Sequence, residues 1–301
     1  MKTNLLILCA LVFSFHFAAE SSTRINEIQI DGIYYDKDFD FALFPNGKVQ
    51  YGLITREAII QNTVFHQHTF IVFYLSSLLK YSEISASTLI NGVLFTPGSQ
   101  IQYYGENVSD ITIYKNKLAI QYVLSYSDYL ISDIPCRAAE KYGNMYINGI
   151  YFYESGRLES CYLSRDVIFA GNQNIFFAKD YWLRFYDTHL RKVRAGTLAG
   201  IQNIQGIYCD GRPTLPKNYL SIQFHPEGAL QWCFIAQDTT IEGKSYKKGQ
   251  ILEFDVQGKF VRVHNSIWDF YSINSPPQSF FKNVTHGQIL ISSKPSSLLC
   301  L

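Results

Sequence analysis

The sequence carries almost no net charge and very little methionine. It contains 26 Lys+Arg against 25 Asp+Glu, and charged residues make up only 17% of its 301 residues. A chain without a basic surplus lacks the electrostatic surface that nucleic-acid binding requires, so no nucleic acid is expected as a partner. Two methionines against 22 tyrosines and 22 phenylalanines favour strands over helices, because aromatic side chains suit a pleated, half-buried surface. With 47% hydrophobic residues, the chain is predicted to fold around a sizeable core.

Long apolar runs are also absent, apart from one at the N-terminus. A basic start is followed by apolar residues from Leu5 through Phe17 and then by small residues. This order is typical of a secretory signal peptide, predicted over residues 1–21, with cleavage after Ser21 or alternatively after Ala19. The run is shorter than the about 20 residues that a membrane-spanning helix needs. We therefore expect no transmembrane helix in the mature chain, and an exported protein that is periplasmic, on the cell surface or secreted.

One hydrophobic frame recurs along the rest of the chain. It consists of an alternating strand, a turn and a second alternating strand. Four copies have a glycine at the turn and three lack it, and their turn positions are Gly47, Ser77, Lys117, Gly156, His189, Gly228 and Gly258. Because a single hairpin is marginally stable in water, the copies are expected to stack on one another. The predicted fold is all-β, with repeated antiparallel β-hairpins stacked into an extended sheet or solenoid. An ordinary β-sandwich is the alternative.

A second, shorter element follows several turns, so each unit is predicted to contain two hairpins. It occurs at Thr88–Gly98, at 203–208 and at Thr240–Gly249. Longer intervals between turns carry insertions, such as Ser132 to Asn144 and Asp210 to Asn218. The repeat domain is predicted over 22–273. A Pro-Pro pair and a serine-rich end then indicate a C-terminal capping strand pair with a flexible tail over 274–301.

The repeated frame resembles a known class of sequence. Its pattern of strand, Asn/Ser/Glu-Gly turn, strand and a following Ile-x-Gly is similar to the divergent MORN-type hairpin repeats of exported bacterial proteins, especially uncharacterised repetitive exported proteins of spirochaetes. The resemblance covers Phe41 to about Val263 and is strongest over Ile150–Asp166 and Ile222–Val263. It implies a β-repeat architecture without a catalytic motif, and a role in scaffolding, envelope association or partner binding.

The cysteines repeat in register with the turns. After removal of Cys9 with the signal, the mature chain keeps Cys136, Cys161, Cys209, Cys233 and Cys300. Two of them lie 20 and 19 residues before Gly156 and Gly228, and two others follow these glycines by 5 residues each. Equivalent positions in two repeats imply equivalent neighbours, so Cys136 with Cys161 and Cys209 with Cys233 are candidate disulfides in an oxidising compartment. The alternative is that they are small, buried core residues. Cys300 is either a free thiol or an intermolecular link.

Exposed rings are the candidate binding residues. Several segments carry more aromatic side chains than one core layer needs, and alternation places some of them outward. The candidates are Tyr181, Trp182, Tyr186, Trp268 and Tyr271. Outward Tyr and Trp on a flat sheet can bind a protein or a saccharide with a large contact area at low entropic cost. The alternative is a two-layered core that covers both faces.

Catalytic and cofactor motifs are missing from the sequence. It has no Gly-x-Ser-x-Gly elbow, no phosphate-binding glycine loop and no Cys-x2-Cys pair, and its one close histidine pair is His66 and His68. We therefore expect no catalytic residues, no metal site and no cofactor. The predicted function is that of an exported binding or structural repeat protein of the cell envelope, whose partner is an unknown protein or saccharide. The alternative is an exported hydrolase with a site in the insertions between repeats.

Overall fold

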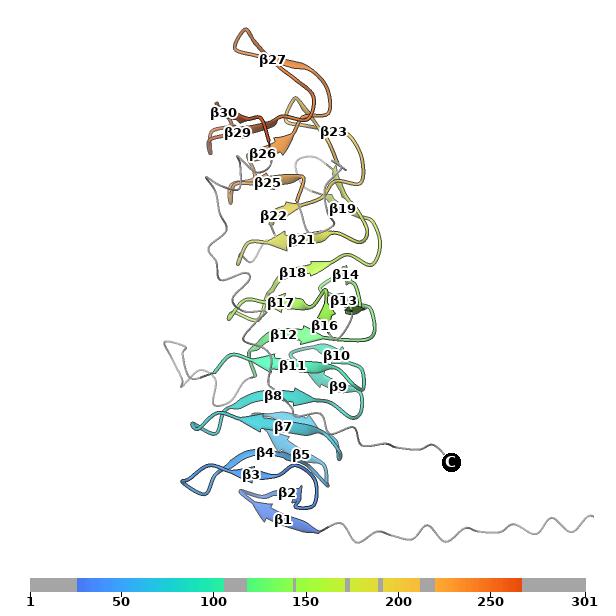
Figure 1. Cartoon of the computed structure of the whole chain (residues 1–301), viewed down its shortest axis with the longest axis vertical. Helices are drawn as coiled ribbons and strands as arrows, with labels where there is room; N and C mark the ends of the chain where they lie inside the picture. The colour runs from blue at the N-terminus through green and yellow to red at the C-terminus, as the bar shows by residue number, and fades with distance from the viewer. Residues whose placement is uncertain are drawn as a thin grey trace, which may run out of the picture.

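The described part of the chain is built entirely from β-strands. The computed structural model describes residues 26–105, 118–142, 145–170, 174–188, 192–211 and 220–266. Regular structure within these ranges is all strand, which confirms the predicted all-β class. Accordingly, none of these residues belongs to a helix long and apolar enough to cross a membrane. Figure 1 shows the strands stacked above one another from β1 at one end to β27, β29 and β30 at the other, so the molecule is long and narrow.

Fourteen strands form one antiparallel sheet, which we call the main sheet. In order across the sheet they are β3 (Ala42–Leu43), β4 (Val49–Leu53), β7 (Phe70–Phe73), β8 (Leu79–Glu83), β11 (Gln100–Tyr103), β12 (Ile120–Leu124), β17 (Ile150–Phe152), β18 (Leu158–Tyr162), β21 (Trp182–Phe185), β22 (Val193–Gly196), β25 (Ile222–Phe224), β26 (Leu230–Phe234), β29 (Ile251–Phe254) and β30 (Phe260–His264). Successive strands pair as seven hairpins, and six of these coincide with predicted copies of the frame. In the third hairpin the first strand is Gln100–Tyr103, whereas the predicted first strand, which begins at Ile111, lies outside the described residues. The predicted turn residues Lys117 and His189 lie outside the described residues.

The other strands form two-stranded sheets, and a hairpin of this kind precedes each main-sheet hairpin. We call these seven the satellite hairpins. They are β1 (Glu27–Ile30) with β2 (Ile33–Asp36), β5 (Ala58–Ile60) with β6 (Thr63–Phe65), β9 (Thr88–Ile90) with β10 (Val93–Phe95), β13 (Tyr129–Ile131) with β14 (Ile134–Cys136), β19 (Val167–Ala170) with β20 (Asn174–Phe177), β23 (Gln202–Ile204) with β24 (Ile207–Cys209), and β27 (Thr239–Ile241) with β28 (Lys244–Tyr246). A further pair, β15 (Glu140–Tyr142) with β16 (Met145–Ile147), follows the fourth. One satellite hairpin and the main-sheet hairpin after it make one repeat unit.

Tight turns close the satellite hairpins. In Asn91-Gly92 both central residues have positive φ, 51° and 82°, as a type I′ turn requires. Gln61-Asn62 has the same signs without a glycine, with φ of 47° and 62°. Ser132-Asp133 is a third example, so the predicted insertion from Ser132 to Asn144 is wrong at its start. These two residues are the turn of a satellite hairpin, which was missed because its turn lacks glycine.

The core lies between the main sheet and the satellite hairpins. One line of residues crosses the inner face of the main sheet, and we call it the inner row: Gly52, Ile71, Ser82, Ile101, Val123, Ile150, Cys161, Leu183, Gly196, Ile222, Cys233, Leu252 and Val263. From the second main-sheet hairpin onward, the first strand contributes a large aliphatic residue to this row, and the second contributes a smaller one. The smaller side chains leave room for a satellite side chain to pack down onto the sheet.

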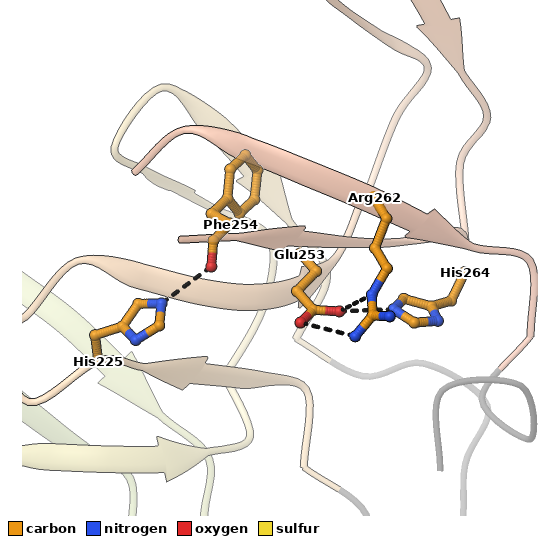
Figure 2. A network of polar contacts seen from close by, with 5 residues as sticks. All are labelled: His225, Glu253, Phe254, Arg262 and His264. Carbon is orange, nitrogen blue, oxygen red and sulfur yellow. Dashed lines mark hydrogen bonds and ion pairs between the residues drawn. The ribbon is translucent and has the colours of Figure 1, made fainter. Parts of the chain in front are cut away.

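Tyrosine hydroxyls connect four of the repeat units to the unit that follows. Tyr74, Tyr104, Tyr153 and Tyr186 occupy the same place at the start of successive main-sheet turns. Each hydroxyl donates to the backbone carbonyl of the last aromatic residue in the first strand of the next hairpin, at Tyr103, Phe152, Phe185 and Phe224, with distances of 3.3, 2.7, 2.7 and 2.6 Å. Burial raises the pKa of Tyr104 to about 12, so its hydroxyl keeps its proton at neutral pH. The series continues at His225, whose ring nitrogen lies 3.0 Å from the Phe254 carbonyl (Figure 2).

Removing one of these hydroxyls should weaken the contact between two neighbouring repeat units. Tyr153→Phe deletes a 2.7 Å hydrogen bond and leaves the Phe185 carbonyl without that donor. We expect the free energy of unfolding to fall by about 1–2 kcal/mol, as measured by urea denaturation. Tyr208→Phe, on a 45% exposed satellite tyrosine, is the matched control and should change stability by less than about 0.5 kcal/mol. Equal effects of the two substitutions would contradict a role for these hydroxyls in joining the repeats.

Candidate functional site: the outer face of the main sheet

A second line of residues crosses the opposite face of the main sheet, away from the satellite hairpins. We call it the outer row: Ala42, Tyr51, Val72, Tyr81, Gln102, Tyr122, Tyr151, Ser160, Arg184, Ala195, Gln223, Trp232, Glu253 and Arg262. Each residue lies opposite the next in the strand register, without a break over fourteen strands. Since neighbouring strands are about 4.8 Å apart, the row is about 60 Å long. It is therefore an extended line of side chains rather than a pocket, and Ser160, Ala195 and Trp232 within it are buried.

Rings contact one another along the middle of this face. The ring centroids of Tyr122 and Tyr151 are 4.7 Å apart, and those of Tyr151 and Trp182 are 5.7 Å apart. Tyr162 completes the group at 4.4 Å from Trp182. We call these four residues the ring cluster. All four rings are tilted by 42° to 48° relative to their neighbours. Tyr122, Tyr151 and Trp182 are half-buried, so the cluster retains some exposed ring surface.

Charged side chains border the ring cluster. Burial raises the pKa of Glu159 above its ordinary value, and the positive charges of Arg184 and Arg194 oppose this only in part. The Arg194 guanidinium lies 5.9 Å from the centre of the Tyr186 ring. Burial likewise raises the pKa of Tyr122 and of Tyr151, so both hydroxyls stay protonated at neutral pH. The face thus offers ring surface beside hydroxyl, carboxyl and guanidinium groups that can form hydrogen bonds.

An ion-pair network lies at the far end of the outer row. Figure 2 shows Arg262 and His264 of β30 converging on Glu253 of β29. Arg262 Nε lies 2.7 Å and His264 Nε2 lies 2.9 Å from the same oxygen, Glu253 Oε2. Arg262 Nη2 lies 3.2 Å from the other carboxylate oxygen, which makes this ion pair bidentate. His264 is only 3% exposed, so the network fixes the last hairpin of the main sheet.

Acidification is expected to destabilise this last hairpin. Burial alone would raise the pKa of Glu253, but hydrogen bonds from Arg262 and His264 outweigh it and the pKa lies below its ordinary value. Such a carboxyl stabilises the fold above the unfolded-state pKa of about 4.3, and this contribution is lost as the pH falls through the folded-state pKa. Thermal melts from about pH 7 to about pH 3 should therefore show a steeper loss for the wild type than for Glu253→Gln. Parallel pH profiles would contradict this assignment.

The structure places three of the five candidate binding aromatics. Trp182 lies on the outer face within the ring cluster. Tyr186 donates its hydroxyl to the Phe224 carbonyl at 2.6 Å, so it joins two repeat units. Tyr181 is half-buried, and its carbonyl accepts a hydrogen bond from Leu163 N. Trp268 and Tyr271 lie outside the described residues.

Three residues of the ring cluster were not predicted from the sequence, namely Tyr122, Tyr151 and Tyr162. A signal for the first was available, because the third residue of the second strand is aromatic in several copies of the frame, at Tyr51, Tyr81, Tyr122 and Trp232. The face of the sheet on which this aromatic position lies depends on the strand register. Only the strand pairing shows that this position faces away from the satellite hairpins and lies beside rings of the next repeat.

The structure brings together both predicted cysteine pairs as thiols. Cys136 Sγ lies 2.6 Å from Cys161 Sγ, and Cys209 forms a side-chain hydrogen bond with Cys233. All four are free and buried, without a covalent bond between them. The predicted proximity is therefore confirmed, whereas disulfide formation remains a prediction. Cys300 lies outside the described residues.

The described residues contain no group of three or more His, Cys, Asp and Glu side chains that could hold a metal ion. His66 and His68 follow β6 in a turn, where His66 Nδ1 lies 3.5 Å from Glu57 Oε2. Most of the second predicted insertion, from Asp210 to Asn218, lies outside the described ranges. No observation specifically favours the hydrolase alternative.

The sequence matches no protein-family model, and no curated protein matches it either.

Proposed function

We propose that this chain is an exported binding module of the cell envelope, which holds an extended ligand along the outer face of the main sheet. The observation that carries the proposal is the ring cluster, in which four aromatic side chains from four strands contact one another on the face opposite the satellite hairpins. Tyr and Trp at such positions provide contact area with few rotatable bonds to immobilise.

The surroundings of the rings favour a saccharide over a protein segment as the ligand. Three of the four rings carry a hydroxyl group, and Glu159 and Arg184 lie close enough to Tyr151 to influence its pKa. A sugar presents apolar C–H faces edged by hydroxyls, so it needs flat ring surface next to hydrogen-bonding groups. A protein hot spot instead requires a fully desolvated pocket. The 47% hydrophobic composition with a net charge of +1 also argues against long-range attraction of a highly charged polymer.

The N-terminal segment and the repeat pattern support the cell envelope as the place of action. The apolar run from Leu5 through Phe17 supports export. The resemblance to MORN-type hairpin repeats of exported bacterial proteins supports an envelope-associated role without catalysis. The long outer row is consistent with a ligand that spans several repeat units.

Cosedimentation with insoluble polysaccharide tests the proposal. Purified mature chain, residues 22–301, is mixed with isolated peptidoglycan sacculi or with cellulose, and the unbound fraction is measured. We expect binding to the envelope polysaccharide, and we expect Trp182→Ala to weaken it about tenfold, equivalent to about 1.4 kcal/mol. Tyr208→Ala removes an exposed ring from a satellite hairpin and should bind as the wild type does. Thermal melts of both variants confirm that each is folded.

Two outcomes would contradict the proposal. Trp182→Ala that binds with wild-type affinity would exclude the ring cluster as the site. A wild-type chain that is retained only by a protein-containing envelope fraction, and no longer after protease treatment of that fraction, would show that the ligand is a protein.

A further inference from the structure

Four repeat units follow a size rule where the satellite strand is bridged to the main sheet, beside Gly52, Cys161, Gly196 and Cys233 of the inner row. In two repeat units a satellite ring packs against a main-sheet glycine, Tyr35 against Gly52 and Phe177 against Gly196. A methyl group at Gly52 would lie 2.9 Å from the Tyr35 ring, and one at Gly196 would lie 2.6 Å from the Phe177 ring. The ring therefore occupies the space that the glycine leaves, and this contact attaches the satellite hairpin to the sheet.

Two other repeat units place a cysteine at both of these positions. Cys136 and Cys209 end the second satellite strand, as Phe177 does, and Tyr35 lies one residue before the end of its strand. The backbone confirms the equivalence, because all four pair by an isolated β-bridge with the residue two places after the small inner-row residue. These bridges are Tyr35–Ile54, Cys136–Leu163, Phe177–Leu198 and Cys209–Ile235. Ring–glycine and cysteine–cysteine contacts thus substitute for each other at one place in the repeat.

The two members of the pair change together. A cysteine in place of the ring alone would leave a void above a glycine, and a cysteine in place of the glycine alone would clash with the ring. Both sulfur atoms of the Cys136–Cys161 pair are fully buried and lie 2.6 Å apart. A reduced pair fills less space than a ring on a glycine, so it attaches the satellite hairpin by fewer contacts.

We propose that Cys136–Cys161 and Cys209–Cys233 are disulfide staples, each of which covalently joins a satellite hairpin to the main sheet where the ring contact is missing. The proposal rests on the export part of the proposed function, because an oxidising compartment is needed, but not on ligand binding. A thiolate of each pair attacks a disulfide such as oxidised glutathione and releases one thiol. The partner thiolate then displaces the second thiol, so two protons and two electrons leave each pair.

Burial determines when the bonds form and how they respond to reductant. Burial raises the pKa of Cys161 and of Cys233 well above the ordinary thiol value, so neither is reactive in the closed fold. Oxidation therefore takes place while a repeat unit is still open, and a formed bond should resist reductant until the chain is unfolded. The two staples lie on either side of the hairpin β21–β22, which carries Trp182 of the ring cluster.

Thiol mapping of the refolded chain tests the proposal. The mature chain is refolded in a buffer of oxidised and reduced glutathione, alkylated under denaturing conditions without reductant, and mapped by peptide mass spectrometry. We expect Cys136 linked to Cys161 and Cys209 linked to Cys233, with the mass of four hydrogens lost. Four alkylated thiols at these positions, or any other pairing among them, would overturn the proposal. Neither result depends on whether the chain binds a saccharide.

A matched variant tests the equivalence of the positions. Phe177→Cys combined with Gly196→Cys adds a third cysteine pair, in the repeat unit between the two natural pairs. We expect a third internal disulfide under the same conditions, whereas Phe177→Cys alone should be alkylated. A double variant with the circular dichroism of the wild type but no disulfide between these residues would show that the ring–glycine and cysteine–cysteine positions are not equivalent.

Discussion

Replacing Gly196 with valine is expected to lower the free energy of unfolding by about 2–3 kcal/mol. An added Cβ would lie 2.6 Å from the Phe177 ring and 2.9 Å from a Leu183 methyl carbon, and both of these side chains are fully buried. The Phe177 ring cannot move without opening the contact that attaches the satellite hairpin β19–β20 to the main sheet. Gly200→Val is the matched control, since nothing lies within 4 Å of an added Cβ there. Urea denaturation measures both substitutions.

A double-mutant cycle tests whether the loss of stability in Gly196→Val arises from contact with the Phe177 ring. Phe177→Ala alone should cost about 3–4 kcal/mol, because it removes a large buried side chain and leaves a cavity. In the double variant the valine side chain partly fills that cavity, so the total cost should fall well below the sum of the two single costs. Simple additivity would contradict the size rule, because it would mean that the two positions do not share one space.

Replacing Leu183 with aspartate should open the stack near its middle. Leu183 is fully buried in the inner row, where a carboxylate finds no partner among the aliphatic side chains. We expect a loss of about 4 kcal/mol or more. Because each repeat unit contacts only its neighbours, the loss should remain local. Amide hydrogen exchange should become fast over β17 to β26 while β4 to β11 retain their protection. Ile201→Asp, at a 60% exposed position, serves as the control.

Uniformly faster exchange over the whole chain would contradict this prediction. It would show that the repeats unfold as one cooperative unit, as a globular β-sandwich does.

The main sheet could be predicted because two features of the sequence indicate its hairpins. Alternation sets the inner face, and glycines such as Gly47 and Gly156, with φ of 81° and 82°, mark the turns. The satellite hairpins were recognised only where a glycine closes them, as at Gly92. Where Gln61-Asn62 or Ser132-Asp133 adopts the same positive φ values, the sequence carries no equally strong signal, because most non-glycine residues avoid this region.

The candidate site could be predicted only in part, for a different reason. Trp182 was identified because it lies in a ring-rich segment. Tyr122 and Tyr151 were missed because their contact depends on the pairing of β12 with β17, two strands separated by a satellite hairpin and a further strand pair. The cysteine pairs were predicted from their repeated spacing, since equal positions in equal repeats have equal neighbours. Their relation to the ring–glycine contacts required the three-dimensional structure.

Amide hydrogen exchange of the unmodified mature chain, resolved by peptide, tests the repeat architecture most directly. Main-sheet strands from β4 to β29 pair on both sides, whereas each satellite strand pairs with only one partner. The account predicts seven blocks of slow exchange at the main-sheet hairpins, separated by faster exchange at the satellite turns such as 61–62, 91–92 and 205–206. Protection without this alternation, or protection that spans the satellite turns and the main-sheet strands equally, would contradict a stack of seven two-hairpin units.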